Sequence, residues 1–177
     1  MTESTLANAK EPLDPPIRGD SFSAEHLWEY AQDVARRQAL ARSGTGDRQF
    51  ADRFERNCRY IATTYQTVIE SVRDQEPISP DAEWLVDNYY VVQEQLREIR
   101  EDMPRSFYLE LPKLVSPPFV GFPRVYELAH VLVAHTDSSL DEELIAGFVA
   151  SYQQVTPLTS GEIWAVPIML RLVLDEN

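Results

Sequence analysis

The chain has 177 residues, which is enough for one domain with a substantial core. Its 16 Lys and Arg residues against 29 Asp and Glu give a formal net charge of -13, and no run of basic residues offers a surface to phosphates. A nucleic-acid-binding protein is therefore not expected. A single cysteine cannot form an internal disulfide, and the N-terminus lacks the pattern of a signal peptide. We expect a cytoplasmic protein that is soluble on its own.

The first half of the chain predicts a leader followed by two helices. Residues 1–21 contain four Pro and Gly residues, Pro12, Pro15, Pro16 and Gly19, and predict a disordered leader before a single domain over residues 22–177. From Ser23 the apolar residues recur every three or four positions, which predicts a helix through about Arg42 and another over residues 48–74. Ser43 to Asp47 interrupt the pattern and predict a break.

The second half repeats the same kind of signal. Ser79 and Pro80 form a helix start, because Ser is a good N-cap and Pro costs nothing at the first helical position. Four further helices are predicted over residues 105–111, 123–135, 140–154 and 159–177, and residues 115–121 predict a stiff exposed connection. No segment shows the alternation of a strand. The sequence thus predicts an all-α fold, a non-repetitive bundle of about six to seven helices.

The predicted final helix is apolar on nearly every side. Thr159 and Glu162 have the spacing of a capping box at its start, but no stop signal follows its last turn, where Asp175 and Glu176 would oppose the helix dipole. A helix without a polar face has to be buried on several sides. We therefore expect an N-terminal fragment of a larger protein, with a docking interface for a downstream domain or a second copy. The predicted interface residues are Trp164, Ile168 and Leu172.

Two groups of residues have the chemistry of a sugar site. Glu83 and Asp87 flank Trp84 at helical spacing, and paired carboxylates beside an aromatic ring suit a glycosidase or a glucan-binding surface. We favour a structural explanation for the same acids, as first-turn residues that favour the helix dipole. Phe119 and Phe122 lie in the Pro-rich connection and are the aromatic residues best placed for an exposed contact.

Other reactive residues do not assemble a complete site. His135, Thr136 and Asp137 could offer two metal ligands where three or four are needed, so we favour a turn in which Asp137 caps the next helix with Ser138 or Ser139. Cys58 has no neighbouring His and is interpreted as a core thiol rather than a nucleophile. No catalytic residue and no metal or cofactor site is predicted for this segment.

Three stretches resemble one known family: residues 79–114 (SPDAEWLVDNYYVVQEQLREIREDMPRSFYLELPKL), 121–137 (GFPRVYELAHVLVAHTD) and 157–174 (PLTSGEIWAVPIMLRLVL). They are similar to the N-terminal helical region of cyclic β-1,2-glucan synthases, large bacterial enzymes of the inner membrane. The resemblance implies a parent protein that transfers glucose from UDP-glucose with a divalent metal and carries a phosphorylase-like domain. None of those catalytic motifs can be matched to positions here. We therefore expect a non-catalytic scaffold, with a module that holds the growing β-1,2-glucan as the alternative.

Overall fold

The computed structural model describes residues 17, 19–41, 49–137 and 139–176, and within these residues it contains seven helices and no strand. The predicted all-α fold is therefore confirmed. The helices are α1 (Ala24–Arg37), α2 (Gln49–Arg73), α3 (Pro80–Asp102), α4 (Arg105–Glu110), α5 (Arg124–His135), α6 (Glu142–Gln153) and α7 (Ser160–Glu176). Most of the predicted leader and the predicted break at 43–47 lie outside the described residues.

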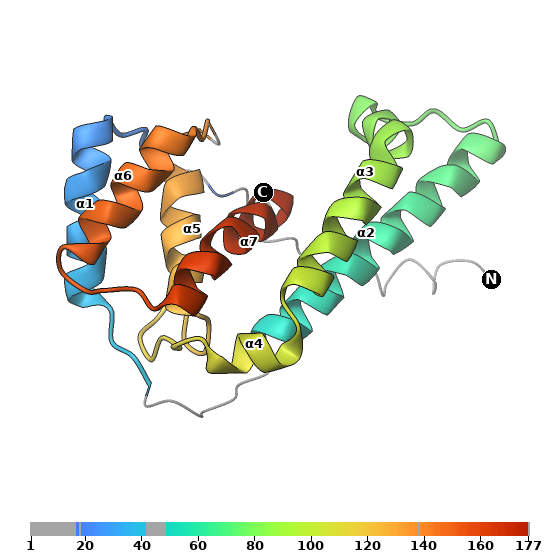
Figure 1. Cartoon of the computed structure of the whole chain (residues 1–177). Coiled ribbons are helices and arrows are strands. Elements are labelled where there is room, and N and C mark those ends of the chain that lie inside the picture. The colour runs from blue at the N-terminus through green and yellow to red at the C-terminus, as the bar shows by residue number, and fades with distance from the viewer. Residues whose placement is uncertain (1–16, 18, 42–48, 138, 177) are drawn as a thin grey trace.

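Helices α1, α5, α6 and α7 form a body, and α2 with α3 forms an arm that extends from it (Figure 1). Helix α5 is the centre of the body, because ten of its twelve residues are buried. Helix α1 packs against α6, and α7 packs against both α5 and the end of α3. An apolar helix such as α5 is stable only when other elements cover it on all sides, and these neighbours supply that cover.

The contact between α1 and α6 depends on a glycine. A Cβ atom built on Gly147 of α6 would lie 2.5 Å from Nε1 of Trp28 on α1, which is closer than atoms can approach. The indole of Trp28 therefore lies directly over the α6 backbone. This close approach explains why α6 carries a residue that is otherwise unfavourable inside a helix.

Helix α1 ends five residues earlier than the sequence predicts. The prediction placed its end near Arg42, whereas the helix stops at Arg37 and Gln38 is its C-cap. The next residues pair with a distant segment instead: the Ala41 amide donates to the Lys113 carbonyl at 2.8 Å and the Val115 amide to the Ala39 carbonyl at 2.9 Å. These long-range hydrogen bonds satisfy backbone groups that helical continuation would otherwise have used.

The chain before α1 lies against the end of α5. The Gly19 amide donates to the Ala134 carbonyl at 2.8 Å, and the Phe22 amide donates to the His135 carbonyl at 3.0 Å. The Phe22 ring is also stacked on the His135 imidazole, with the ring centres 4.0 Å apart. The carbonyl groups at a helix C-terminus need such donors, so the last part of the predicted leader supplies part of the cap of α5.

The start of α6 also differs from the prediction. Its N-cap is Asp141, whose carboxylate accepts the Leu144 amide at 2.7 Å. Asp137, which was expected to cap this helix, adopts a positive φ of 49° in the turn after α5. Asp tolerates this conformation better than most residues, so Asp137 lies in the turn four residues before the N-cap Asp141.

Candidate functional site

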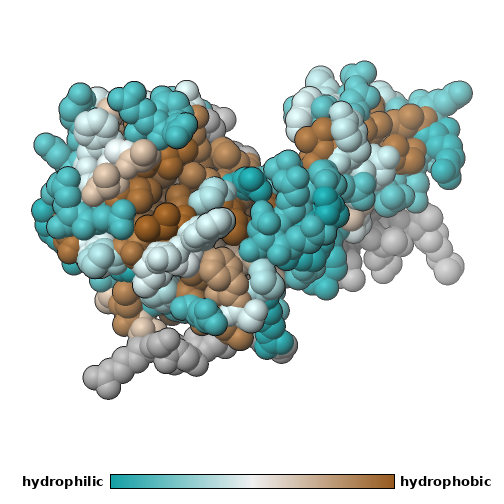
Figure 2. Space-filling view, in the orientation of Figure 1, coloured by the Kyte–Doolittle hydropathy of each residue, from teal (hydrophilic) through white to brown (hydrophobic). Residues whose placement is uncertain are grey.

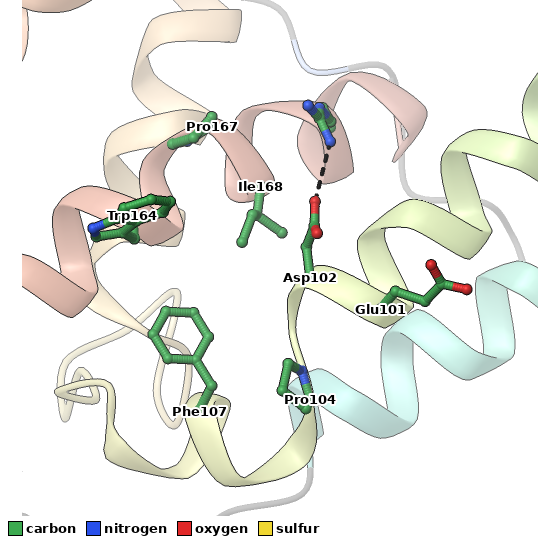
Figure 3. A pocket seen from close by; sticks show the side chains of 8 residues that line it. Glu101, Asp102, Pro104, Phe107, Trp164, Pro167 and Ile168 are labelled. Carbon is green, nitrogen blue, oxygen red and sulfur yellow. Dashed lines mark hydrogen bonds and ion pairs between the residues drawn. The ribbon is translucent and has the colours of Figure 1, made fainter.

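A groove opens between the end of α3, α4 and the exposed side of α7 (Figure 3). We call it the α7 groove. Its volume is about 630 Å³. It is lined by Glu101, Asp102, Pro104, Phe107, Trp164, Pro167, Ile168 and Arg171. A concave surface that combines aromatic, aliphatic and charged side chains is the usual composition of a binding site.

The apolar part of the groove lies between α4 and α7. Trp164 is 75% exposed, which is unusual for a residue of its size. The Phe107 side chain points from α4 into the groove, with Trp164 across from it on α7, and Ile168 projects into the groove beside Trp164 (Figure 3). Ile168 itself is only 7% exposed. The groove therefore offers two aromatic walls above an aliphatic floor.

The other end of the groove is charged. The Arg171 guanidinium lies 3.4 Å from the Asp102 carboxylate and 3.6 Å from that of Glu98. Glu101 instead pairs with Arg97 at 2.7 Å, and its side chain points away from the groove (Figure 3). All these groups are partly exposed, so the ion pairs are weak and can exchange for contacts with a bound molecule.

The start of α7 is fixed by hydrogen bonds that the sequence partly predicts. The Thr159 hydroxyl accepts the Glu162 amide at 3.2 Å and the Glu162 carboxylate accepts the Thr159 amide at 2.9 Å, which confirms the capping box. Glu162 is fully buried and also accepts two hydrogen bonds from the guanidinium of Arg124 on α5. Burial would raise the pKa of Glu162, but the hydrogen bonds from Arg124 and Thr159 hold it below its usual value.

The last turn of α7 is held by contacts that the sequence does not reveal. The Glu176 carboxylate accepts hydrogen bonds from Arg53 at 3.0 Å, Asn57 at 2.9 Å and Tyr126 at 2.6 Å. An acid here opposes the helix dipole, as the sequence predicts, but three donors from α2 and α5 offset that cost. Both ends of α7 are thus anchored, and the groove has a rigid wall.

The three predicted docking residues have different surroundings. Trp164 is exposed on the groove, Ile168 forms its floor, and Leu172 is 1% exposed in the core of this chain. The predicted burial of the helix is present, but α5 and α3 of the same chain provide most of it. Of the three, Trp164 alone leaves most of its surface free for a partner. The apolar residues exposed on α7 are Ile163, Trp164, Pro167 and Leu174.

Glu83, Trp84 and Asp87 lie far from the groove, on the exposed surface of the arm. At about 1.5 Å per residue, Glu83 is roughly 27 Å along α3 from Glu101. Trp84 is 60% exposed. Among the described residues, no side chain from another element forms a hydrogen bond or an ion pair with the carboxylates of Glu83 and Asp87. A sugar-binding role for Glu83, Trp84 and Asp87 stays a prediction.

The expected exposure of Phe122 is wrong. Phe122 is 8% exposed and its ring lies 4.9 Å from that of Tyr126, so it belongs to the core. Phe119 is half-buried, with its ring 5.4 Å from Tyr126 and 4.9 Å from His130. The Pro-rich connection folds back onto α5, and this brings both rings against the helix rather than into solvent. Of these two rings, Phe119 is the one with exposed surface that could contact a ligand.

The described residues hold no group of three or more His, Cys, Asp or Glu side chains that could bind a metal ion. The His135 ring nitrogen Nδ1 lies 2.7 Å from the Asp20 carbonyl, which explains its position without a ligand. Cys58 is half-buried, and burial raises the pKa of its thiol. A raised pKa reduces the thiolate fraction that a nucleophile needs. Among the described helices, none has the length and apolar character to span a membrane.

Comparison with known proteins supports the family resemblance. The chain is 38% identical, over an alignment of 180 residues, to the cyclic β-(1,2)-glucan synthase NdvB of Rhizobium meliloti (strain 1021). The alignment covers 99% of this chain and 6% of that protein, so the chain spans a small part of the length of this relative. No protein-family model matches the chain. The chain is therefore homologous to one segment of a bacterial cyclic β-(1,2)-glucan synthase.

Proposed function

We propose that this relative of a glucan-synthase segment is a non-catalytic helical scaffold, and that its α7 groove docks onto the glucosyltransferase portion of a cyclic β-(1,2)-glucan synthase. The docking would take place on the cytoplasmic side of the inner membrane. In this proposal UDP-glucose and the divalent metal bind elsewhere in the synthase. The homologous segment makes up only 6% of the relative, so ample further chain is present there to occupy the groove.

The exposure of Trp164 is the observation that carries this proposal. Its side chain is 75% exposed beside Phe107 and Ile168, on a helix whose two ends are both anchored. Residues that contribute most to protein interfaces are Trp, Tyr and Arg near the centre of a preorganised surface. The α7 groove presents Trp164 and Arg171 in this way, with Asp102 and Glu98 as polar partners at the rim.

The proposal can be tested in a chimera in which this chain replaces the homologous segment of NdvB. Trp164→Ala should lower glucan synthesis by the chimera several-fold, because the docking contact loses its main apolar anchor. Trp84→Ala is the matched control, since Trp84 is also exposed but lies on the arm. The isolated variants should unfold at the same denaturant concentration as the parent chain. Equal synthesis by all three chimeras, with equal protein levels, would contradict docking through the groove.

A second candidate function is binding of the glucan itself in the same groove. The observation that favours it is the pair of aromatic walls, Trp164 and Phe107, next to the Arg171–Asp102 ion pair. Sugar rings stack their apolar faces on aromatic side chains, and their hydroxyl groups bond to charged groups at the edge. Carbohydrate binding would thus use surfaces that are already in place.

Titration of the isolated chain with cyclic β-(1,2)-glucan separates the two functions. Glucan binding predicts a saturable change in tryptophan fluorescence that Trp164→Ala and Phe107→Ala abolish. Docking alone predicts no change at any concentration. A response that survives Trp164→Ala but disappears with Trp84→Ala would instead place the sugar beside Glu83 and Asp87 on the arm.

A further inference from the structure

The arm formed by α2 and α3 lacks a core of its own. Over the 41 consecutive residues from Glu55 to Gln95, no side chain is fully buried, whereas α5 buries ten of its twelve residues. The apolar residues between the two helices, such as Tyr65 and Tyr89 with stacked rings 3.6 Å apart, are half-buried. Two packed helices cover each other on one side only, so the remaining sides of the arm stay in contact with solvent.

Large apolar side chains occupy these uncovered sides. Tyr60 and Val72 of α2 and Trp84, Tyr90 and Val91 of α3 are between 38% and 72% exposed. Figure 2 shows apolar surface on the arm as well as on the body. Large apolar side chains that an element leaves exposed to solvent are candidates for contact with a partner.

The charges of the arm differ between its two helices. Helix α2 contains four Arg residues and three acids, a net charge of +1, whereas α3 contains two Arg residues and seven acids, a net charge of -5. Arg59 and Arg73 of α2 and Asp81 and Glu83 of α3 take part in no ion pair within the described part of the chain. The arm therefore presents a weakly basic and a strongly acidic helix, and these four charges are available to a partner.

We propose that the arms of two copies of this chain pack together into a four-helix bundle. The charges select one arrangement, with the two-fold axis along the arms, because only this places the basic α2 of each copy against the acidic α3 of the other. A two-fold axis across the arms would place α3 against α3, with like charges facing each other. This surface is separate from the α7 groove, so self-association is independent of the proposed docking function.

The stacked rings of Tyr65 and Tyr89 lie at the same height along the arm. Helices α2 and α3 run in opposite directions, so any two residues on them whose numbers add up to about 154, as 65 and 89 do, lie at the same height. Glu83 and Glu94 lie 11 residues apart, about three helical turns, and so share one face of α3. In the proposed dimer Arg73 would therefore lie near Glu83 of the second copy, and Arg59 would lie near its Glu94, which pairs with Arg97 within its own chain. Each contact occurs twice because of the symmetry.

Charge reversal provides a direct test, with the molecular mass measured by analytical ultracentrifugation over a range of concentrations. The full chain should approach twice its mass of 20.3 kDa as concentration rises. Two variants reverse the charges on one side of the contact each: Arg59→Glu with Arg73→Glu, and Glu83→Lys with Glu94→Lys. Each should dimerise at least about tenfold more weakly alone, since like charges then face each other. An equimolar mixture of the two should dimerise like the parent chain.

The control is Arg36→Glu on α1, which changes an exposed charge on the body and should leave dimerisation unchanged. A chain that stays monomeric up to high concentration at low salt would overturn the proposal. So would dimers that both arm variants form as readily as the parent chain, or a mixture that fails to recover dimerisation while both variants remain helical. The docking experiment with Trp164→Ala is unaffected by either outcome.

Discussion

Arg124 and Glu162 are the residues that join the helices of the body. Their side chains are 5% and 0% exposed, and the Arg124 guanidinium also donates to the Pro157 carbonyl at 2.9 Å and the Tyr152 hydroxyl at 3.3 Å. The Tyr152 hydroxyl in turn donates to Gln38 at 2.7 Å, so one network links α5, α6 and α7 to the end of α1. A buried charged pair is costly to break because either partner alone lacks compensation.

Loss of one partner of this pair should therefore destabilise the whole chain. Arg124→Met leaves the Glu162 carboxylate buried without its main donor, and we expect the free energy of unfolding to fall by about 3–5 kcal/mol in urea denaturation. The double variant Arg124→Met with Glu162→Leu should recover part of that loss. Arg97→Met, which breaks an exposed pair, should change little. A loss for Arg124→Met no larger than for Arg97→Met would contradict this view of the network.

The buried side chain of Lys113 should make the free energy of unfolding depend on pH. It is 5% exposed, its ammonium donates to the Leu111 carbonyl at 2.8 Å, and burial lowers its pKa to about 8 from 10.5. Between these two values the unfolded chain binds more protons than the folded chain, so the contribution of Lys113 to the free energy of unfolding rises with pH.

The corresponding test compares the parent chain with Lys113→Met in urea denaturation at about pH 7 and about pH 10. The parent chain should gain stability relative to the variant at the higher pH. The difference between the two proteins isolates Lys113, because all other groups titrate in both. Parallel pH profiles, or a relative loss for the parent chain, would show that Lys113 keeps an ordinary pKa.

At the scale of elements, the local signals in the sequence predict the helices well and their long-range contacts poorly. Ser23, Ser79 and Thr159 cap helices as their spacing indicates, because a cap depends only on the next three residues. The early end of α1 depends on residues 113–115, about 75 residues further along the chain. The buried Phe122 ring lies under the guanidinium of Arg53, which is 69 residues away. Periodicity alone contains no such information.

The α7 groove could not be predicted for the same reason. It combines residues 101–107 with residues 164–171, and no local pattern places these two segments side by side. The sequence does identify α7 as a helix that needs burial on several sides. It does not reveal that α5 and α3 of the same chain bury most of α7. The side chain of Trp164 stays exposed because neither helix covers it.

The packing of α1 on α6 gives a prediction with a matched control. Gly147→Ala would place its Cβ 2.5 Å from Trp28, so the helices must separate, and overpacking of this kind costs about 1–3 kcal/mol of unfolding free energy. Gly161→Ala on α7 meets its nearest neighbour only at 3.5 Å and should be neutral or stabilising, as Ala favours helix. Thermal unfolding of both variants measures the difference. Equal melting temperatures would mean that α1 and α6 tolerate a wider spacing.

At the scale of the whole molecule, the chain divides its surfaces between two tasks. The body has a continuous core with α5 at its centre, and it holds the groove between anchored helices. The arm extends from that body without a buried core. The groove is the surface that we assign to docking in a glucan synthase, and the arm is the surface that we assign to a second copy.

Oxidation of Trp164 by hydroxyl radicals tests the docking claim most directly. The isolated chain and the NdvB chimera would be labelled at the same concentration, with Trp84, also exposed, as the internal reference. Docking predicts that Trp164 is oxidised several-fold more slowly in the chimera while the Trp84 rate is unchanged. Equal oxidation of Trp164 in both proteins would mean that the groove remains open to solvent in the synthase, and it would contradict the proposed function.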